Sequence, residues 1–439
     1  MMKGKLGIIL ALSILVCTSV LSQGCAKKES TNTFDVLTDY QYQYYQPDDA
    51  YSGNITEDED GNLYYLAGCY IYKYDVTNGR NAPLCNKPNC LHDKEKNPDR
   101  YKECNAYYQY IGTEQYSSMA YEKGSIYIAD PGFGDGWTTR ILRISKDGAE
   151  REVIHKFSSQ FLNSIFHRGY FYYQEETYDK NNKQTLSIKR YPLRHKGKSE
   201  TLWQFPKGGN GYGIQGIKAY GDYLYFDATG DLGKDRYYNK YFVYNIIDGQ
   251  LNEIKPKAYK NSLIFGINFF NNKLMYYSQD GDHLNSQYDV DVYECDLDGA
   301  NSRKTGITMP VGYDIYSDGK HFVVSNDNVL SISQAINKKN FEKGSKAIYK
   351  VYDKAYKLVD TYTEELKEDN VAQDGYKLYY GPIGVNNMSY CVVRNNETGI
   401  VELYGGSKEQ IGELDGRLFD RKRLAVIKNV PAVFEYLKQ

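Results

Sequence analysis

Three cysteines and one histidine lie close together in the first quarter of the chain. Cys85, Cys90, His92 and Cys104 are spaced C-x4-C-x-H-x11-C, within the run LCNKPNCLHDKEKNPDRYKECNAYY. Thiolate sulfur and imidazole nitrogen are ligands that Zn²⁺ prefers, and four of them complete a tetrahedral shell. The spacing therefore predicts one structural zinc ion that orders residues 85–104, a segment with few apolar side chains.

The same cysteines are compatible with disulfides or with a catalytic site. Exported proteins commonly pair their thiols, so two disulfides among Cys69, Cys85, Cys90 and Cys104 are an alternative in which His92 is incidental. A catalytic metal would need an open ligand position with an acid or base beside it. Cys69 follows the apolar run GNLYYL and is predicted to emerge near the segment as an additional thiol.

The first residues have the pattern of an export signal. Two lysines precede an apolar run over residues 6–21, which is too short for a comfortable membrane span. The stretch LSQGC that follows resembles a bacterial lipoprotein signal, in which Cys25 is lipidated and becomes the new N-terminus. We expect residues 1–24 to be the signal peptide, residues 25–33 to be a tether, and the chain to be anchored by lipid to the extracytoplasmic face of the cell membrane. An ordinary secretory signal cut nearby is the alternative.

Composition argues against one class of partner. The chain carries 54 Lys+Arg against 56 Asp+Glu, a net charge of -2, so electrostatic attraction to nucleic acid is not expected. Tyrosine is abundant, with 47 residues. Its ring packs while its hydroxyl reaches water, which suits half-buried strands or a surface that binds sugars or peptides.

Residues 34–439 contain a repeat. An apolar or aromatic run that follows a tight turn recurs at intervals of about 45 to 65 residues, a spacing typical of propeller blades. Eight such runs begin near Leu63, Ile126, Phe171, Leu224, Leu274, Phe322, Leu378 and Leu424. We predict a single all-β domain, a β-propeller of four-stranded antiparallel blades in which each run is a second strand. Eight blades are favoured, with seven as the alternative, and residues 34–37 are expected to supply the missing outer strand that closes the ring.

The connections between the predicted strands are unequal in length. Turns from first to second strand are short, whereas second-to-third loops such as DPGFGDGWTT and QDGDHLNSQY are long. Since loops on a rigid scaffold usually carry binding, the face with the long loops is the candidate recognition surface, and the cysteine segment is expected there too. Acidic residues in these loops, among them Asp227 and Asp231, match no calcium-binding pattern and are expected to be turn residues.

The cysteine run supports a resemblance. The pattern PLCNKPNCLHD…ECNAYY, with recurrent GxLYY strands, resembles a family of uncharacterised, propeller-bearing surface lipoproteins of Gram-positive anaerobes. That family is related in pattern to the propeller of low-density-lipoprotein-receptor-related proteins. The resemblance covers nearly all of the mature chain and implies a propeller at a membrane surface, but no reaction. An anaerobic setting would favour a metal over disulfides in the cysteine segment.

The sequence contains no recognisable catalytic signature. It has neither a GxSxG nucleophile nor the S-x-D-x-G-x-x-W boxes of sialidases. We therefore favour a binding protein that recognises a glycan, peptide or protein partner over an enzyme. One alternative is an extracellular polysaccharide hydrolase or lyase, whose paired carboxylates sequence spacing cannot place. A second alternative is a structural subunit of an envelope or transporter assembly.

Overall fold

The structure is a computed structural model of the chain. It describes residues 55–108, 118–130, 139–157, 163–195, 197–206, 210–214, 216–231, 237–255, 262–280, 289–317, 321–326, 346–365, 376–383, 388–395, 400–407 and 422–428. The chain divides into two compact units, Met1–Thr31 and Asn32–Gln439, and every described residue belongs to the second. Within these ranges no helix has the length and apolar character needed to cross a membrane. The predicted signal peptide, Cys25, the tether and the strand at residues 34–37 lie outside the described residues.

Antiparallel sheets form nearly all of the regular structure in the described ranges. The first sheet contains β1 (Ile55–Glu57), β2 (Leu63–Ala67), β3 (Tyr70–Asp75) and β4 (Arg80–Pro83). The second contains β5 (Met119–Glu122), β6 (Ser125–Asp130), β7 (Arg140–Ser145) and β8 (Arg151–Lys156). The third contains β9 (Ser164–His167), β10 (Tyr170–Tyr178), β11 (Gln184–Pro192) and β12 (Glu200–Gln204).

Four further sheets follow in chain order. The fourth contains β13 (Asn210–Gly213), β14 (Ile217–Tyr220), β15 (Tyr223–Asp231), β16 (Tyr237–Asn245) and β17 (Leu251–Ile254). The fifth contains β18 (Ser262–Phe270), β19 (Lys273–Asp280), β20 (Val290–Cys295) and β21 (Arg303–Met309). The sixth contains β22 (Asp314–Ser317), β23 (Phe322–Ser325), β24 (Lys346–Tyr352) and β25 (Leu358–Glu365), and the seventh contains β26 (Tyr376–Ile383), β27 (Met388–Asn395), β28 (Ile400–Ser407) and β29 (Lys422–Ile427).

Each sheet is a meander made by tight turns. In the fifth sheet, for example, Asn271 and Asn272 join β18 to β19 with φ angles of 52° and 57°. Asparagine tolerates this left-handed conformation, and two such residues in succession give the turn whose twist matches a hairpin. In the fourth sheet β13 and β14 both pair with β15, so the first strand of that sheet is interrupted.

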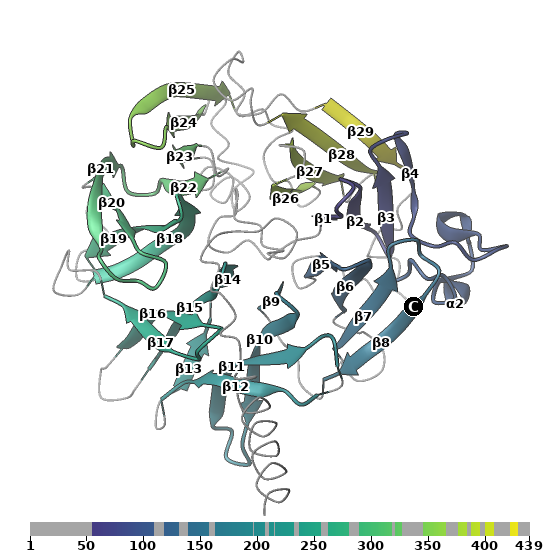
Figure 1. The fold of residues 1–439 in the computed structure, drawn as a ribbon, viewed down its shortest axis with the longest axis horizontal. Coiled ribbons are helices and arrows are strands. Elements are labelled where there is room, and N and C mark those ends of the chain that lie inside the picture. Colours follow the sequence, from purple (N-terminus) through teal and green to yellow (C-terminus); the bar gives the residue numbers. More distant parts are fainter. Residues whose placement is uncertain are drawn as a thin grey trace, which may run out of the picture. The chain divides into compact units, whose positions relative to one another are not determined.

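Neighbouring sheets stack face to face through buried apolar side chains. From the first sheet to the sixth, each successive pair shares one hydrophobic cluster of described residues, rich in tyrosine and phenylalanine. Tyr64, Tyr172 and Tyr276 are completely buried in these clusters. Figure 1 shows the sheets following one another in chain order, with strands such as β1, β5 and β9 toward the middle of the view. Stacked four-stranded meanders of this kind define the β-propeller class, as predicted.

The last predicted repeats differ from the prediction. The run at Leu378 lies in β26, the first strand of the seventh sheet, and the run at Leu424 lies in β29, the fourth strand of the same sheet. Both were predicted to be second strands of separate blades. An apolar run after a turn has the same alternating pattern in an inner and an outer strand, so periodicity could not separate the two. The described residues therefore form seven sheets where eight repeats were favoured.

The first and last sheets are also in contact. Tyr390 and Leu403 of the seventh sheet lie in the same buried cluster as Ile55 and Leu63 of the first. Burial raises the pKa of Tyr390, and the nearby carboxylate of Glu57 raises it further. Figure 1 shows β26 beside β1. Side-chain packing thus joins the two ends of the described array.

Candidate metal centre

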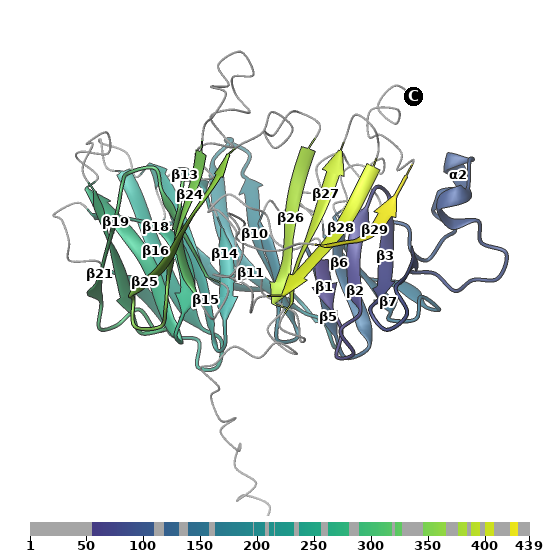
Figure 2. The same cartoon turned by 90° about the horizontal axis from the view of Figure 1, so that it is seen from above.

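The connection between the first and second sheets carries the cysteine segment. Cys85 follows the end of β4 by one intervening residue, and His92 opens the short helix η1 (His92–Lys94). A single helical turn, α2 (Pro98–Tyr101), comes next. Asn97 caps it by accepting a hydrogen bond from the Asp99 N–H at 3.1 Å, and proline occupies its first position. Figure 2 shows α2 projecting beyond the strands of the first sheet.

The segment brings its four predicted ligands together. The sulfur atoms of Cys85, Cys90 and Cys104 and a ring nitrogen of His92 all lie within 4.8 Å of one another. Cys104 Sγ is 3.6 Å from His92 Nδ1. These four side chains supply donor atoms that zinc prefers, and they lie close enough together to hold a metal ion. Among the described residues, no other cluster of His, Cys, Asp and Glu side chains does so. The thiol of Cys69 is not part of the group.

Backbone amides point at two of the sulfur atoms. Burial raises the pKa of Cys85, but hydrogen bonds from the Lys87 and Asn105 N–H groups, together with the neighbouring thiols, lower it overall. Burial raises the pKa of Cys104 and prevails over the N–H of Ala106, which lowers it. In both cases one donor is the amide two residues after the cysteine. Such amides stabilise thiolate charge, which a metal-bound sulfur carries.

The surroundings of the histidine favour its neutral form. Burial lowers the pKa of His92; Asp93 raises it and Lys94 lowers it. A neutral imidazole is the form that binds metal. His92 and the nearby Asn89 also adopt positive φ angles of 52° and 65°, and a left-handed backbone is uncommon for residues other than glycine. The local chain is therefore bent in a manner that places Cys90 and His92 beside the other two ligands.

The segment is fixed to the second sheet at a turn. Asn105 Nδ2 donates to the carbonyl oxygens of Gly148 and Ala149, each at 2.9 Å, and the Asn86 N–H donates to Gly148 at 3.3 Å. Gly148 has a φ of +74°, and a Cβ built there would lie 2.7 Å from the nitrogen of Cys85. Only glycine allows the two backbones to approach this closely.

The segment is fixed to the first sheet as well. The Tyr108 N–H donates to the Cys69 carbonyl at 3.0 Å, and the Ile71 N–H donates to Ala106 at 2.9 Å. Cys69 thus lies beside the segment, as predicted, and its backbone carbonyl makes the contact. The contact with the second sheet was not predicted: Gly148 belongs to the short turn between β7 and β8. The backbones at Cys85 and Gly148 approach closely, and the repeat period of the sequence carries no information about such a contact.

The ends of the segment are buried and its middle is not. Leu84 and Cys104 are 2% exposed and Tyr108 is fully buried, whereas Leu91 is 49% exposed. The middle therefore lacks an apolar core of its own.

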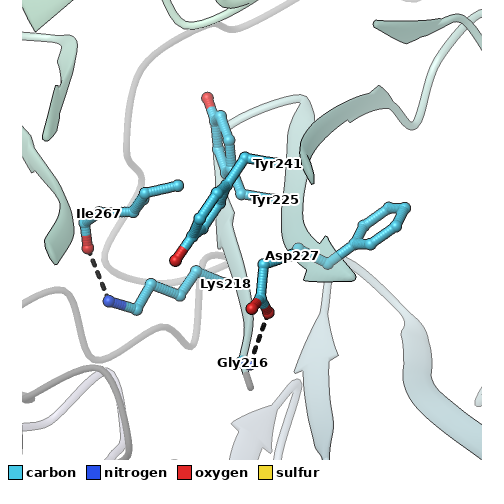
Figure 3. Close-up of a pocket in the computed structure, with 7 residues that line it drawn as sticks. Gly216, Lys218, Tyr225, Asp227, Tyr241 and Ile267 are labelled. Atoms are coloured by element: carbon cyan, nitrogen blue, oxygen red, sulfur yellow. Dashed lines mark hydrogen bonds between the residues drawn. The ribbon is translucent and has the colours of Figure 1, made fainter. Parts of the chain in front are cut away.

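A second feature is a small pocket at the boundary of the fourth and fifth sheets. Its lining residues are Gly216, Lys218, Tyr225, Phe226, Asp227, Tyr241 and Ile267. Figure 3 shows Lys218 pointing to the Ile267 carbonyl, which it reaches at 2.6 Å, and away from Asp227. Asp227 accepts a hydrogen bond from the Gly216 N–H at 3.3 Å. The pocket gathers one acid, one amine and two phenols, all groups that can move protons.

Several further predicted residues are placed by the structure. Asp227 and Asp231 lie in β15 and not in a loop, because that strand is longer than predicted. Cys295 in β20 is a buried thiol, 1% exposed, between the fourth and fifth sheets. Most of the long loops proposed for recognition lie outside the described residues. Sequence patterns did not predict that Gly148 and Asn105 contact each other. The only local signal was that Gly148 is a turn glycine.

Comparison with known proteins identifies no family. Neither a protein-family model nor a curated protein matches the chain. A prolyl endopeptidase structure is 12% identical with a TM-score of 0.48, over 90% of this chain and 51% of that one. An oligogalacturonate lyase from Vibrio parahaemolyticus is 12% identical with a TM-score of 0.45, over 84% and 91% of the two chains. The present chain spans about half the length of the endopeptidase.

The contact at Gly148 can be tested by substitution. Gly148→Ala is expected to lower the free energy of unfolding by about 2–4 kcal/mol, because the new Cβ would strike the Cys85 backbone in addition to straining φ. Gly124→Ala is the matched control, since its φ is +82° with nothing within 4 Å of the new Cβ. The control should lose only about 1–2 kcal/mol. Urea unfolding measures both, and equal losses would mean that the turn does not hold the segment.

Proposed function

We propose that the chain is a lipid-anchored, extracytoplasmic binding protein whose cysteine segment is built on one structural zinc ion. The observation that carries this proposal is the convergence of Cys85, Cys90, His92 and Cys104. Four protein ligands fill a tetrahedral shell and leave no position for a substrate or an activated water. These three cysteines and the histidine would therefore have a structural role. Such a role fits a binding protein better than an enzyme.

Geometry favours the metal over the disulfide alternative. Two disulfides would require Cys69 to pair with one of the remaining three thiols, but its sulfur is not part of the compact group. A single disulfide among Cys85, Cys90 and Cys104 would give no role to the third cysteine or to His92. Zinc uses all four residues at once and agrees with the amides directed at Cys85 and Cys104.

Metal content provides the direct test. Mature protein purified without reductant should contain about one equivalent of zinc, and Cys85→Ser and Cys104→Ser should each abolish it because three ligands bind zinc far more weakly. Elemental analysis with thiol counting measures this. Cys295→Ser is the control, since that buried thiol lies outside the group and should leave the zinc in place. Metal-free protein with blocked thiols would establish disulfides instead.

The anchor is supported by the signal pattern and by the resemblance to surface lipoproteins. In a Gram-positive host fed an alkyne fatty acid, the whole chain should be labelled, and Cys25→Ala should remove the label because no other site receives the lipid. Cys17→Ala, which changes a thiol within the predicted signal, should remain labelled. Label that persists in the Cys25 variant would refute the anchor.

The ligand is a glycan, a peptide or a protein partner. The alternative is a polysaccharide hydrolase or lyase, and the pocket of Lys218, Asp227 and Tyr241 is the observation that favours it. A role as a structural subunit of an envelope or transporter assembly is a third possibility, in which crosslinking on cells would capture a neighbouring protein.

One panel separates binding from turnover. Immobilised polysaccharides and peptides incubated with the purified mature chain should retain it without release of reducing or unsaturated sugars. Asp227→Asn should then retain the ligand equally, since the pocket would not be catalytic. Sugar release that this variant abolishes would replace the binding role with an enzymatic one.

A further inference from the structure

One face of the second sheet is turned toward the cysteine segment. Leu142 and Ile144 of β7 lie in the same buried cluster as Leu84 and Cys104. Arg151 of β8 is paired in register with Ile144. Since paired residues of neighbouring strands project from the same face of a sheet, the Arg151 side chain is directed to this cluster.

Arg151 carries a positive charge that no acidic side chain among the described residues binds in an ion pair. Its Nε is buried and has no hydrogen-bond partner, and no ion pair to it forms among the described residues. The nearby carboxylate, Asp130, is fully buried and is already bound by Arg140, whose Nε and Nη2 are each 2.7 Å from Asp130 Oδ2. Two guanidinium groups therefore face one carboxylate in a buried region, where an uncompensated charge is costly.

The thiol of Cys104 is among the groups that act on Arg151. Burial lowers the pKa of Arg151 and Arg140 lowers it further, whereas Asp130, Tyr107 and Cys104 raise it. Arginine stays protonated in proteins regardless. The positive charge of Arg151 thus acts on the sulfur atom that is also a predicted metal ligand.

The charges of a zinc centre at this site would balance that of Arg151. Zinc brings two positive charges, three thiolates bring three negative ones, and the imidazole is neutral. We propose that Arg151 is the counter-charge of the metal centre, a positioning residue that stabilises the anionic three-thiolate shell without binding the metal. This role of Arg151 rests on the proposed zinc ion.

Zinc affinity in purified mature protein, measured by competition with a chromogenic chelator, tests the role. Arg151→Met keeps an unbranched apolar stem and removes the charge, and should weaken zinc binding about 10–100-fold, the usual effect of losing an outer-shell partner. Arg151→Lys keeps the charge and should restore most of the affinity. Arg143→Met is the control, because Arg143 pairs at 3.1 Å with an exposed glutamate on the same sheet and should not change affinity.

A ligand exchange separates the charge effect from a loss of packing. Cys90→His turns the shell into two thiolates and two imidazoles, which makes the zinc centre neutral. Arg151→Met should then weaken zinc binding in the Cys90 parent but not in the Cys90→His background. An equal loss in both backgrounds, or no loss in the parent, would overturn the role of Arg151. Wild-type protein that binds no zinc would instead overturn the proposed centre itself.

Discussion

Burial of sheet faces against neighbouring sheets holds the described structure together. A four-stranded meander has two apolar faces and cannot bury either alone, so its neighbours must cover them. Tyrosine does much of this work: Tyr64, Tyr172 and Tyr276 are completely buried, although each carries a hydroxyl group. The phenol of Tyr64 donates to Asp58 at 2.8 Å, which satisfies the polar end within the core. Sheet packing thereby accounts for many of the tyrosines among the described residues.

The cysteine segment cannot use the same interaction. Its ends reach the sheets, but the middle has no apolar cluster, and Leu91 beside two of the ligands is half exposed. Burying one large apolar side chain contributes about 1.5–3 kcal/mol, whereas a structural zinc ion contributes about 10–16 kcal/mol. One zinc ion, if bound as proposed, would therefore replace several core residues. The segment joins the first sheet to the second through Asn105 and the turn at Gly148, so its order bears on the contact between sheets.

Sequence patterns predicted the fold class and the convergence of Cys85, Cys90, His92 and Cys104. They failed where tertiary contact decides. Alternating apolar runs after tight turns located six of the second strands correctly, because that signal is local. The runs at Leu378 and Leu424 have the same local signal but occupy the first and fourth strands of one sheet. Asp227 was expected in a loop and lies in a strand. The roles of Gly148 and Arg151 depend on backbones and charges that are distant in the chain, and spacing alone carries no record of such contacts.

The coordination of the metal tests the proposed zinc centre most directly. Zinc K-edge X-ray absorption on the purified mature protein reports the atoms bound to the ion and their distances. We predict three sulfur atoms at about 2.3 Å and one nitrogen at about 2.0–2.1 Å. A shell of nitrogen and oxygen alone, without sulfur from Cys85, Cys90 and Cys104, would contradict the centre.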